Sequence, residues 1–325
     1  MTRAGLCPVR RQTRAYFAPV DRTSGTTTVF DPSKDGTFQL DAPPSPWIDL
    51  GWVEEFRRTS TSQIEAMKGG PASGVMAQAH TALGAKIELQ FREWGKVQMA
   101  LACGSEHMNV LATDPSASRA GSGGVPVAAV SLLEGTSETE LVLGAGAVDG
   151  FAISDLVACD VDYAQETGYV GTGIAAAYVK DPEKVHRDAN YIRRVTFNVG
   201  RVAQKTATSL LLAQRLPGGQ PAPGAAVQRV TAFVDREGGT FLQQWSGLFI
   251  EEEESGGRVC FYYPRLSPSV AGEVWEREQR VNIDEAIGML ALRASFVALP
   301  TVDENDGAVV LCYRSYFPGG NGAVY

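Results

Sequence analysis

Residue types that could carry catalysis or bind a metal are scarce and scattered in this sequence. The chain has 325 residues and three histidines, His80, His107 and His186. Cys103 and His107 are four residues apart, a spacing that one turn of a helix would bring together. A structural zinc site needs four ligands, and no second ligand pair accompanies these two residues. The sequence therefore predicts no metal site.

Two short motifs imitate nucleotide-binding sequences, but their surroundings differ from those of such sites. Residues 171–176 read GTGIAA, the spacing of a dinucleotide-binding loop, which requires a strand before it and a helix after it. Pro182 soon follows, so we interpret this segment as a glycine-containing strand. Residues 186–188 read HRD, as in a kinase catalytic loop, without the asparagine that such a loop requires. The sequence therefore predicts no catalytic residues, no cofactor and no enzymatic activity.

The strongest charge cluster is a run of carboxylates at Glu251, Glu252, Glu253 and Glu254, followed by Ser-Gly-Gly. Adjacent carboxylates repel one another unless water or cations screen them, so the run is typical of a solvated turn. It lacks the spaced oxygen ligands of a calcium loop. Its functional interpretation is a negatively charged surface.

The composition places the chain among globular proteins and limits its partners. Hydrophobic residues make up 44% and charged residues 20% of the chain, and the net charge of −8 disfavours specific binding to nucleic acid. No apolar run is long enough to cross a bilayer, and no secretory signal is recognisable. The five cysteines are far apart and odd in number, which indicates synthesis in a reducing cytoplasm. An intersubunit disulfide through Cys7 remains open.

Many short alternating segments, separated by Gly and Pro, predict a mainly β protein with a sandwich or barrel. Residues 94–103 have helical spacing, and Gly104 follows as a stop signal, so one helix is expected there. A short helix or turn is expected at 181–190, and a helical or mixed segment is expected at 284–290. The expected strands are 47–58, 86–93, 125–133, 139–143, 157–163, 168–179, 192–199, 206–214, 227–234, 240–250, 258–263, 292–299 and 308–316, the last two forming a hairpin around residues 303–307.

Two segments lack a core pattern. Residues 60–84 are small and polar with Gly-Gly-Pro near their centre, and they predict a loop far longer than a hairpin turn. Residues 1–45 mix arginines with Ser, Thr, Gly and Pro. They predict an N-terminal arm that either stays disordered or becomes ordered by lying across a neighbouring subunit.

The order of these elements resembles that of the tail tube (major tail) proteins of tailed bacteriophages. The resemblance covers roughly residues 46–110 and 190–318. It rests on Asp-Leu-Gly at 49–51 before the long segment, the return strand and the helix. It also rests on the segments 232–238 and 244–249 and on the closing hairpin. It implies a β-sandwich or barrel tube domain with a flanking helix and a long loop. The expected domains are an arm (1–45), two parts of the tube domain (46–124 and 186–325) and an inserted or decorating β region (125–185).

The resemblance also implies a mechanical function in the virion tail after synthesis in the host cytoplasm. Six chains would form a ring, or three if the chain holds two tube-like halves, and stacked rings would form the conduit for double-stranded DNA. The implied partners are other copies of the chain and sheath, terminator and baseplate proteins, and no membrane is involved. The implied site residues are Ser60, Met67, Gly70, His80 and Gly84 for ring stacking, Cys7, Arg14 and Phe30 for subunit contact through the arm, and Glu251, Glu252, Glu253 and Glu254 for the lumen.

Three alternatives remain open. Another ring component of a tail or injection particle would have similar elements; examples are a terminator, a baseplate ring and the inner tube of an injection system. A carbohydrate-binding β-sandwich would need exposed aromatic residues on one face and a secretory signal. An enzyme on a β scaffold would need a convergent catalytic set, which the sequence does not provide.

Overall fold

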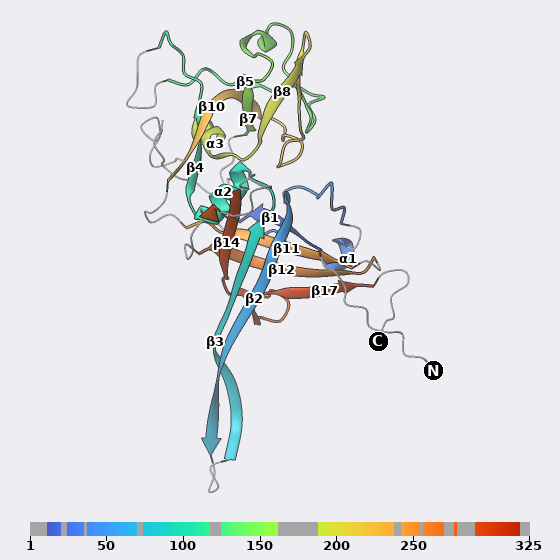
Figure 1. Cartoon of the computed structure of the whole chain (residues 1–325), viewed down its shortest axis with the longest axis vertical. Helices are drawn as coiled ribbons and strands as arrows, with labels where there is room; N and C mark the ends of the chain where they lie inside the picture. The colour runs from blue at the N-terminus through green and yellow to red at the C-terminus, as the bar shows by residue number, and fades with distance from the viewer. Residues whose placement is uncertain are drawn as a thin grey trace, which may run out of the picture.

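The structure is a computed structural model that describes residues 12–20, 25–35, 38–69, 74–117, 125–161, 188–236, 242–253, 256–269, 276–277 and 290–318. Among the described residues, strands hold 50% and helices 10%, which confirms the mainly-β prediction. Two sheets dominate, one closed into a barrel and one placed above it in Figure 1.

The barrel has six antiparallel strands in the order β14-β3-β2-β1-β11-β12, and it closes where β12 pairs with β14. These strands are β1 (Gln12–Pro19), β2 (Ile48–Gly69), β3 (Gly74–Phe91), β11 (Trp245–Glu252), β12 (Arg258–Pro268) and β14 (Leu290–Ala298). Closure removes the open edges of these strands where they belong to the barrel. β13 (Glu276–Arg277) pairs with β14 outside the ring of strands, and β17 (Tyr313–Phe317) pairs with β12.

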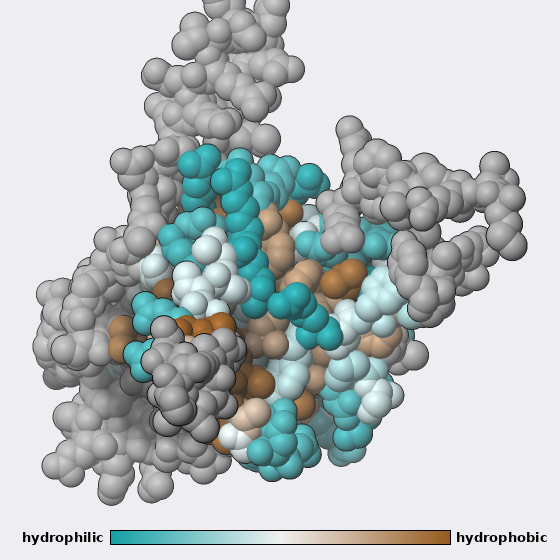
Figure 2. All heavy atoms as spheres, turned by 90° about the horizontal axis from the view of Figure 1, so that it is seen from below, coloured by the Kyte–Doolittle hydropathy of each residue, from teal (hydrophilic) through white to brown (hydrophobic). Residues whose placement is uncertain are grey.

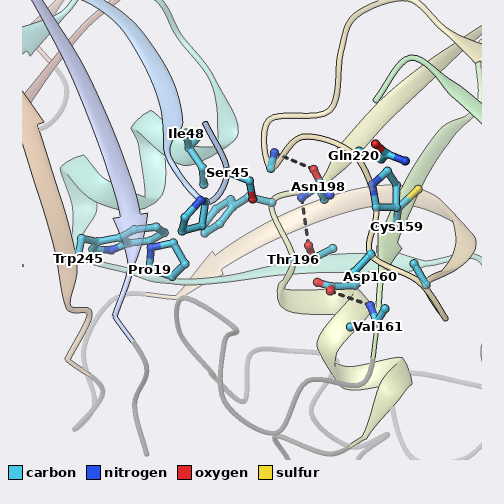
Figure 3. Close-up of a pocket in the computed structure, with 16 residues that line it drawn as sticks. Pro19, Ser45, Ile48, Cys159, Asp160, Val161, Thr196, Asn198, Gln220 and Trp245 are labelled. Atoms are coloured by element: carbon cyan, nitrogen blue, oxygen red, sulfur yellow. Dashed lines mark hydrogen bonds between the residues drawn. The ribbon is translucent and has the colours of Figure 1, made fainter. Parts of the chain in front are cut away.

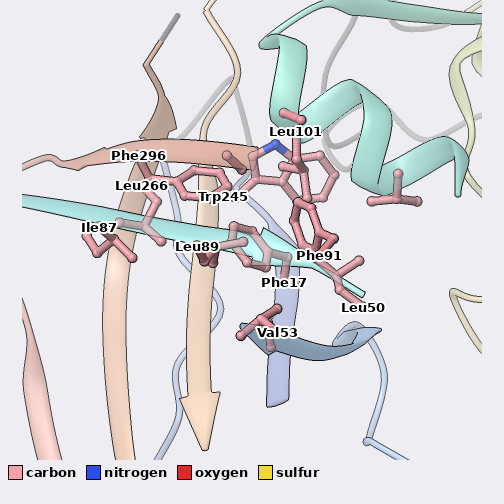
Figure 4. Packing of buried hydrophobic residues seen from close by; sticks show 14 of the residues in the cluster. Phe17, Leu50, Val53, Ile87, Leu89, Phe91, Leu101, Trp245, Leu266 and Phe296 are labelled. Atoms are coloured by element: carbon pink, nitrogen blue, oxygen red, sulfur yellow. The ribbon is translucent and has the colours of Figure 1, made fainter. Parts of the chain in front are cut away.

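The interior of the barrel is filled with large hydrophobic side chains (Figure 4). Phe17, Trp245 and Phe296 are fully buried there, and the ring centroids of Phe17 and Phe296 are 5.1 Å apart. Helix α2 (Lys96–Cys103) places Leu101 on the same cluster. Its last turn ends at Gly104, whose φ of 59° is a left-handed cap. The predicted helix is therefore confirmed, and the described side chains pack the interior of the barrel into one hydrophobic core.

The predicted N-terminal arm is wrong for its described part. β1 is a strand of the barrel wall between β2 and β11. The described residues 25–35 and 38–47, which include α1 (Pro32–Asp35), cover the outer face of β1, β11 and β12. Tyr16 faces this cover, and its hydroxyl donates to the carbonyl of Leu40 at 3.0 Å. Both faces of β1 are buried, so its sequence reads Ala-Tyr-Phe-Ala without polar alternation. The arginines near this segment indicated an exposed arm, and the strand was therefore not predicted.

The predicted long loop at 60–84 is also wrong. β2 and β3 continue through it as one antiparallel hairpin that pairs from Val53 with Phe91 to Gly69 with Gly74. A β-bulge interrupts the pairing between Glu54 and Arg57, where Glu55 adopts a φ of 53°. Such a bulge bends a strand and increases its twist. Here it lies where β2 leaves the barrel wall.

The second sheet is a continuous insertion between β3 and β11 and is larger than the predicted 125–185 region. Its strands are β4 (Glu106–Leu111), β5 (Val130–Ser131), β6 (Glu140–Val142), β7 (Leu156–Asp160), β8 (Val199–Lys205), β9 (Ser209–Leu212) and β10 (Ala226–Arg236). Its order is β4-β10-β7-β8-β9-β6, with β5 beside β10, and a 3₁₀ turn spans Ala147–Gly150. We call this part the inserted sheet.

Two local predictions differ from the structure. The first half of the strand expected at 192–199 belongs to helix α3 (Ala189–Val195), because the Asp188 carboxylate accepts hydrogen bonds from the second and third amides and caps the helix. The closing hairpin exists only as β15 (Thr301–Val302) paired with β16 (Val309–Val310), since β14 and β17 pair with different parts of β12. The segments expected at 168–179, 181–187 and 284–289 lie outside the described residues, as do both nucleotide-site motifs except for Asp188.

Candidate functional site

The outer part of the β2–β3 hairpin projects from the barrel (Figure 1). β1 accompanies β2 only as far as Val53, and β14 accompanies β3 only from Ala85 to Phe91. Beyond these points, the two strands pair only with each other within the described part of the chain. At about 3.3 Å per residue, the ten residues from 60 to 69 extend on the order of 30 Å.

This projecting segment, residues 59–84, lacks a hydrophobic core of its own where its side chains are described. Residues 59–66 are all exposed, and Ile64 and Leu83 keep 55% and 40% of their surface accessible. A two-stranded hairpin is marginally stable alone in water, and its unpaired backbone edges favour pairing with another chain. Figure 2 views the molecule from the hairpin side and shows hydrophobic surface framed by hydrophilic side chains. The projecting hairpin is therefore the candidate interaction site.

The structure brings together most of the residues predicted for ring stacking. Ser60 pairs with Ala85 at the base of the projecting hairpin, and Gly84 pairs with Thr61. Met67 and His80 lie further out, opposite Ala77 and Ile64. Gly70 lies outside the described residues. They belong to one paired element, and their role in stacking stays a prediction.

The residues predicted for the arm have different positions from those expected. The Arg14 guanidinium bonds both carboxylate oxygens of Asp49, and its Nη1 lies 2.7 Å from Oδ1 of Asp41. Phe30 is 4% exposed and packs edge-on to Phe38. Both side chains hold the cover onto the barrel within one chain, so they are not available for a neighbouring subunit. Cys7 lies outside the described residues.

The acidic run lies at the end of β11 and in the turn toward β12. Glu252 pairs with Arg258 at 2.9 Å, and Glu251 lies opposite Thr13 and Val259. The amide of Glu253 donates to the carbonyl of Gly257 at 2.8 Å, as expected for a turn. Glu254 lies outside the described residues. A role of these carboxylates in a lumen stays a prediction.

A buried polar cluster joins the inserted sheet to the barrel, and sequence reasoning missed it. The Lys96 ammonium donates to Oδ1 of Asn109 at 2.5 Å and to the carbonyl of Thr196 at 2.6 Å. His107 is fully buried, and its Nδ1 lies 3.0 Å from Oδ1 of Asp235. The available signal was His107 and Asn109 on one face of a strand. Cys103 ends α2 and His107 lies on β4, so the two are not on one helix as the metal-site interpretation required.

Because His107 is buried, we expect the free energy of unfolding to fall in acid. Burial lowers the pKa of His107 from 6.5 to about 4, although Asp235 opposes the shift. The stability contributed by the neutral imidazole is complete above pH 6.5 and is lost as the pH falls from 6.5 to 4. This loss amounts to about 3 kcal/mol at most. We expect His107→Gln to reduce the difference in urea-unfolding free energy between pH 7 and pH 4.5. A pH dependence equal to that of the wild type would contradict this assignment.

The described residues contain neither a cluster of metal ligands nor a membrane-spanning helix. No group of three His, Cys, Asp or Glu residues in the described ranges could hold a metal ion. None of the helices described is long and apolar enough to cross a membrane. No protein-family model matches the chain, and no curated protein is significantly similar to it in sequence.

Proposed function

We propose that the protein is a structural subunit that associates with its own copies through the projecting hairpin, and that the assembly is the ring-stacked tube of a phage tail. The observation that supports this proposal is the pair of strands leaving a closed barrel, because neither outer edge pairs with another strand of the described residues. A hairpin of this kind becomes fully paired and covered only when another chain supplies the partner. A second copy is the partner that is always present.

The filled interior of the barrel favours a conduit formed between several chains over a conduit inside a single chain. Phe17, Trp245 and Phe296 fill it, so any passage for DNA would lie between subunits. Closed rings of identical chains provide such a passage by symmetry. The net charge of −8 would disfavour adhesion of DNA phosphates to its wall. Sheath, terminator and baseplate proteins are the further partners of this proposal.

A charge placed on the projecting hairpin tests the association. We expect Ile64→Arg combined with Leu83→Arg to weaken self-association at least about tenfold, because each substitution would bury an unpaired charge in the interface. Both residues are exposed in the single chain, so the unfolding midpoint should change little. The measurement is sedimentation velocity over a concentration series.

Val29→Arg is the matched control. Val29 is 68% exposed and lies on the barrel cover, outside the sequence of the projecting hairpin. It should associate like the wild type. If the double variant also associates like the wild type, the hairpin is not the contact. If the wild type forms one finite ring without stacking, a terminator or baseplate ring fits better than a tube.

A further inference from the structure

A cavity of about 190 Å³ lies between the barrel and the inserted sheet. Figure 3 shows Pro19, Ser45 and Ile48 on its barrel side and Asp160, Asn198 and Gln220 on the opposite side. The barrel side is mainly apolar, whereas the opposite side carries one carboxylate and two amides. Since a water molecule takes about 30 Å³ of liquid volume, the cavity could hold one side-chain-sized group. It is smaller than the usual pocket for a drug-sized molecule.

Asp160 is the charged group on the wall of this cavity, and the groups around it offset its negative charge only in part. One carboxylate oxygen accepts from the amide of Val161 at 2.8 Å, and the Thr196 side chain also bonds the carboxylate. Asp149 and Asp155 of the inserted sheet lie within 4.0 Å of Lys205 and Arg229. Asp160 has no basic partner at such a distance among the described residues, and Arg193 acts on it only at longer range.

The partial burial of this carboxylate has an energetic cost. Desolvation raises the pKa of Asp160 from 3.8 to about 6, despite the hydrogen bonds and Arg193. A partly buried carboxylate is retained at such a cost most readily where a ligand completes its environment. A cationic ligand would lower this pKa again.

We propose that the cavity binds an ammonium or guanidinium group on a short aliphatic stem, with the cation at Asp160 and the stem against Pro19 and Ile48. N–H donors on a cation form the strongest hydrogen bonds to a carboxylate, and proline and isoleucine side chains suit a chain of methylene groups. This site goes beyond the proposed function and does not require self-association. The group could come from a free amine or from a Lys or Arg side chain of another chain.

Titration with n-butylguanidinium chloride tests the site, with ligand-induced amide shifts around residues 158–161 and 196–198 followed by NMR. We expect saturable binding that is at least about tenfold weaker in Asp160→Asn and unchanged in Asp149→Asn. Asp149 is the matched control, because its carboxylate lies on the same inserted sheet and is 80% exposed. Binding should also weaken about tenfold between pH 7 and pH 5 as Asp160 takes up a proton. 1-Butanol, which has the stem without the charge, should not saturate the site.

Two further measurements keep the test decisive. If Asp160→Asn does not fold, the carboxyl ¹³C titration of Asp160 in the wild type replaces it, and saturating ligand should lower its pKa. Sedimentation with and without ligand distinguishes the sources. A side chain of another copy predicts that ligand dissociates wild-type assemblies, whereas a free amine predicts binding without dissociation. Absence of saturable binding, or equal binding to wild type and Asp160→Asn, would overturn the proposal.

Discussion

Replacing residues 61–84 by Asn-Gly is expected to abolish self-association and to leave the barrel folded. Ser60 and Ala85 are paired directly, so a two-residue type I′ turn can join them. The removed residues contribute nothing to the hydrophobic clusters of the described chain, so unfolding free energy should change by less than about 1 kcal/mol. Sedimentation velocity and urea unfolding measure the two effects.

The expected loss of association is larger than that of any point substitution, because both the unpaired edges and the exposed hydrophobic side chains disappear together. A shortened protein that still assembles into rings but not into tubes would show that the hairpin stacks the rings and is not needed to form them. A shortened protein that forms tubes like the wild type would contradict the proposed role. Loss of the folded barrel would show that the hairpin is needed for folding.

Phe17→Ala is expected to reduce the unfolding free energy by about 3 to 5 kcal/mol. Phe17 is fully buried, and its ring lies 5.7 Å from Phe249, 6.4 Å from Trp245 and 5.1 Å from Phe296, measured between centroids. Truncation would leave a cavity in the core of the barrel between β1, β11 and β14. Urea unfolding followed by tryptophan fluorescence gives the value.

Val29→Ala serves as the control for this substitution, because Val29 is exposed and its truncation should stay within about 0.5 kcal/mol. An N-terminal arm outside the core would predict an equally small effect for Phe17. A change below about 1 kcal/mol for Phe17→Ala would therefore restore the arm and contradict the central position of β1.

The sequence predicted the elements whose two faces differ in polarity. β3 alternates from Lys86 to Phe91 and was recognised, and α2 was recognised from its spacing and Gly104. β1 was missed because both of its faces are buried, which removes the alternation. The outer halves of β2 and β3 were missed for the opposite reason, since their described side chains are exposed on both faces. Alternation of polar and apolar residues with a period of two indicates that one face of a strand is buried. It does not indicate whether the strand is paired with another.

The polar cluster and the cavity could not be predicted because they depend on distant segments. Lys96 and Thr196 are 100 residues apart in the chain, and His107 and Asp235 are 128 residues apart. No local pattern identifies such pairs before the topology is known. α3 was a different kind of error, because Tyr191, Ile192 and Val195 are spaced for one helical face as well as for a strand.

Electron microscopy of the purified full-length protein over a concentration series tests the central claim most directly. We expect rings at low concentration and stacked hollow tubes at high concentration, with a lumen on the order of the 20 Å width of duplex DNA. The chain with residues 61–84 replaced should form neither. A wild-type protein that stays monomeric at every concentration, even when preformed tail tips are supplied as initiators, would contradict a tube-forming function.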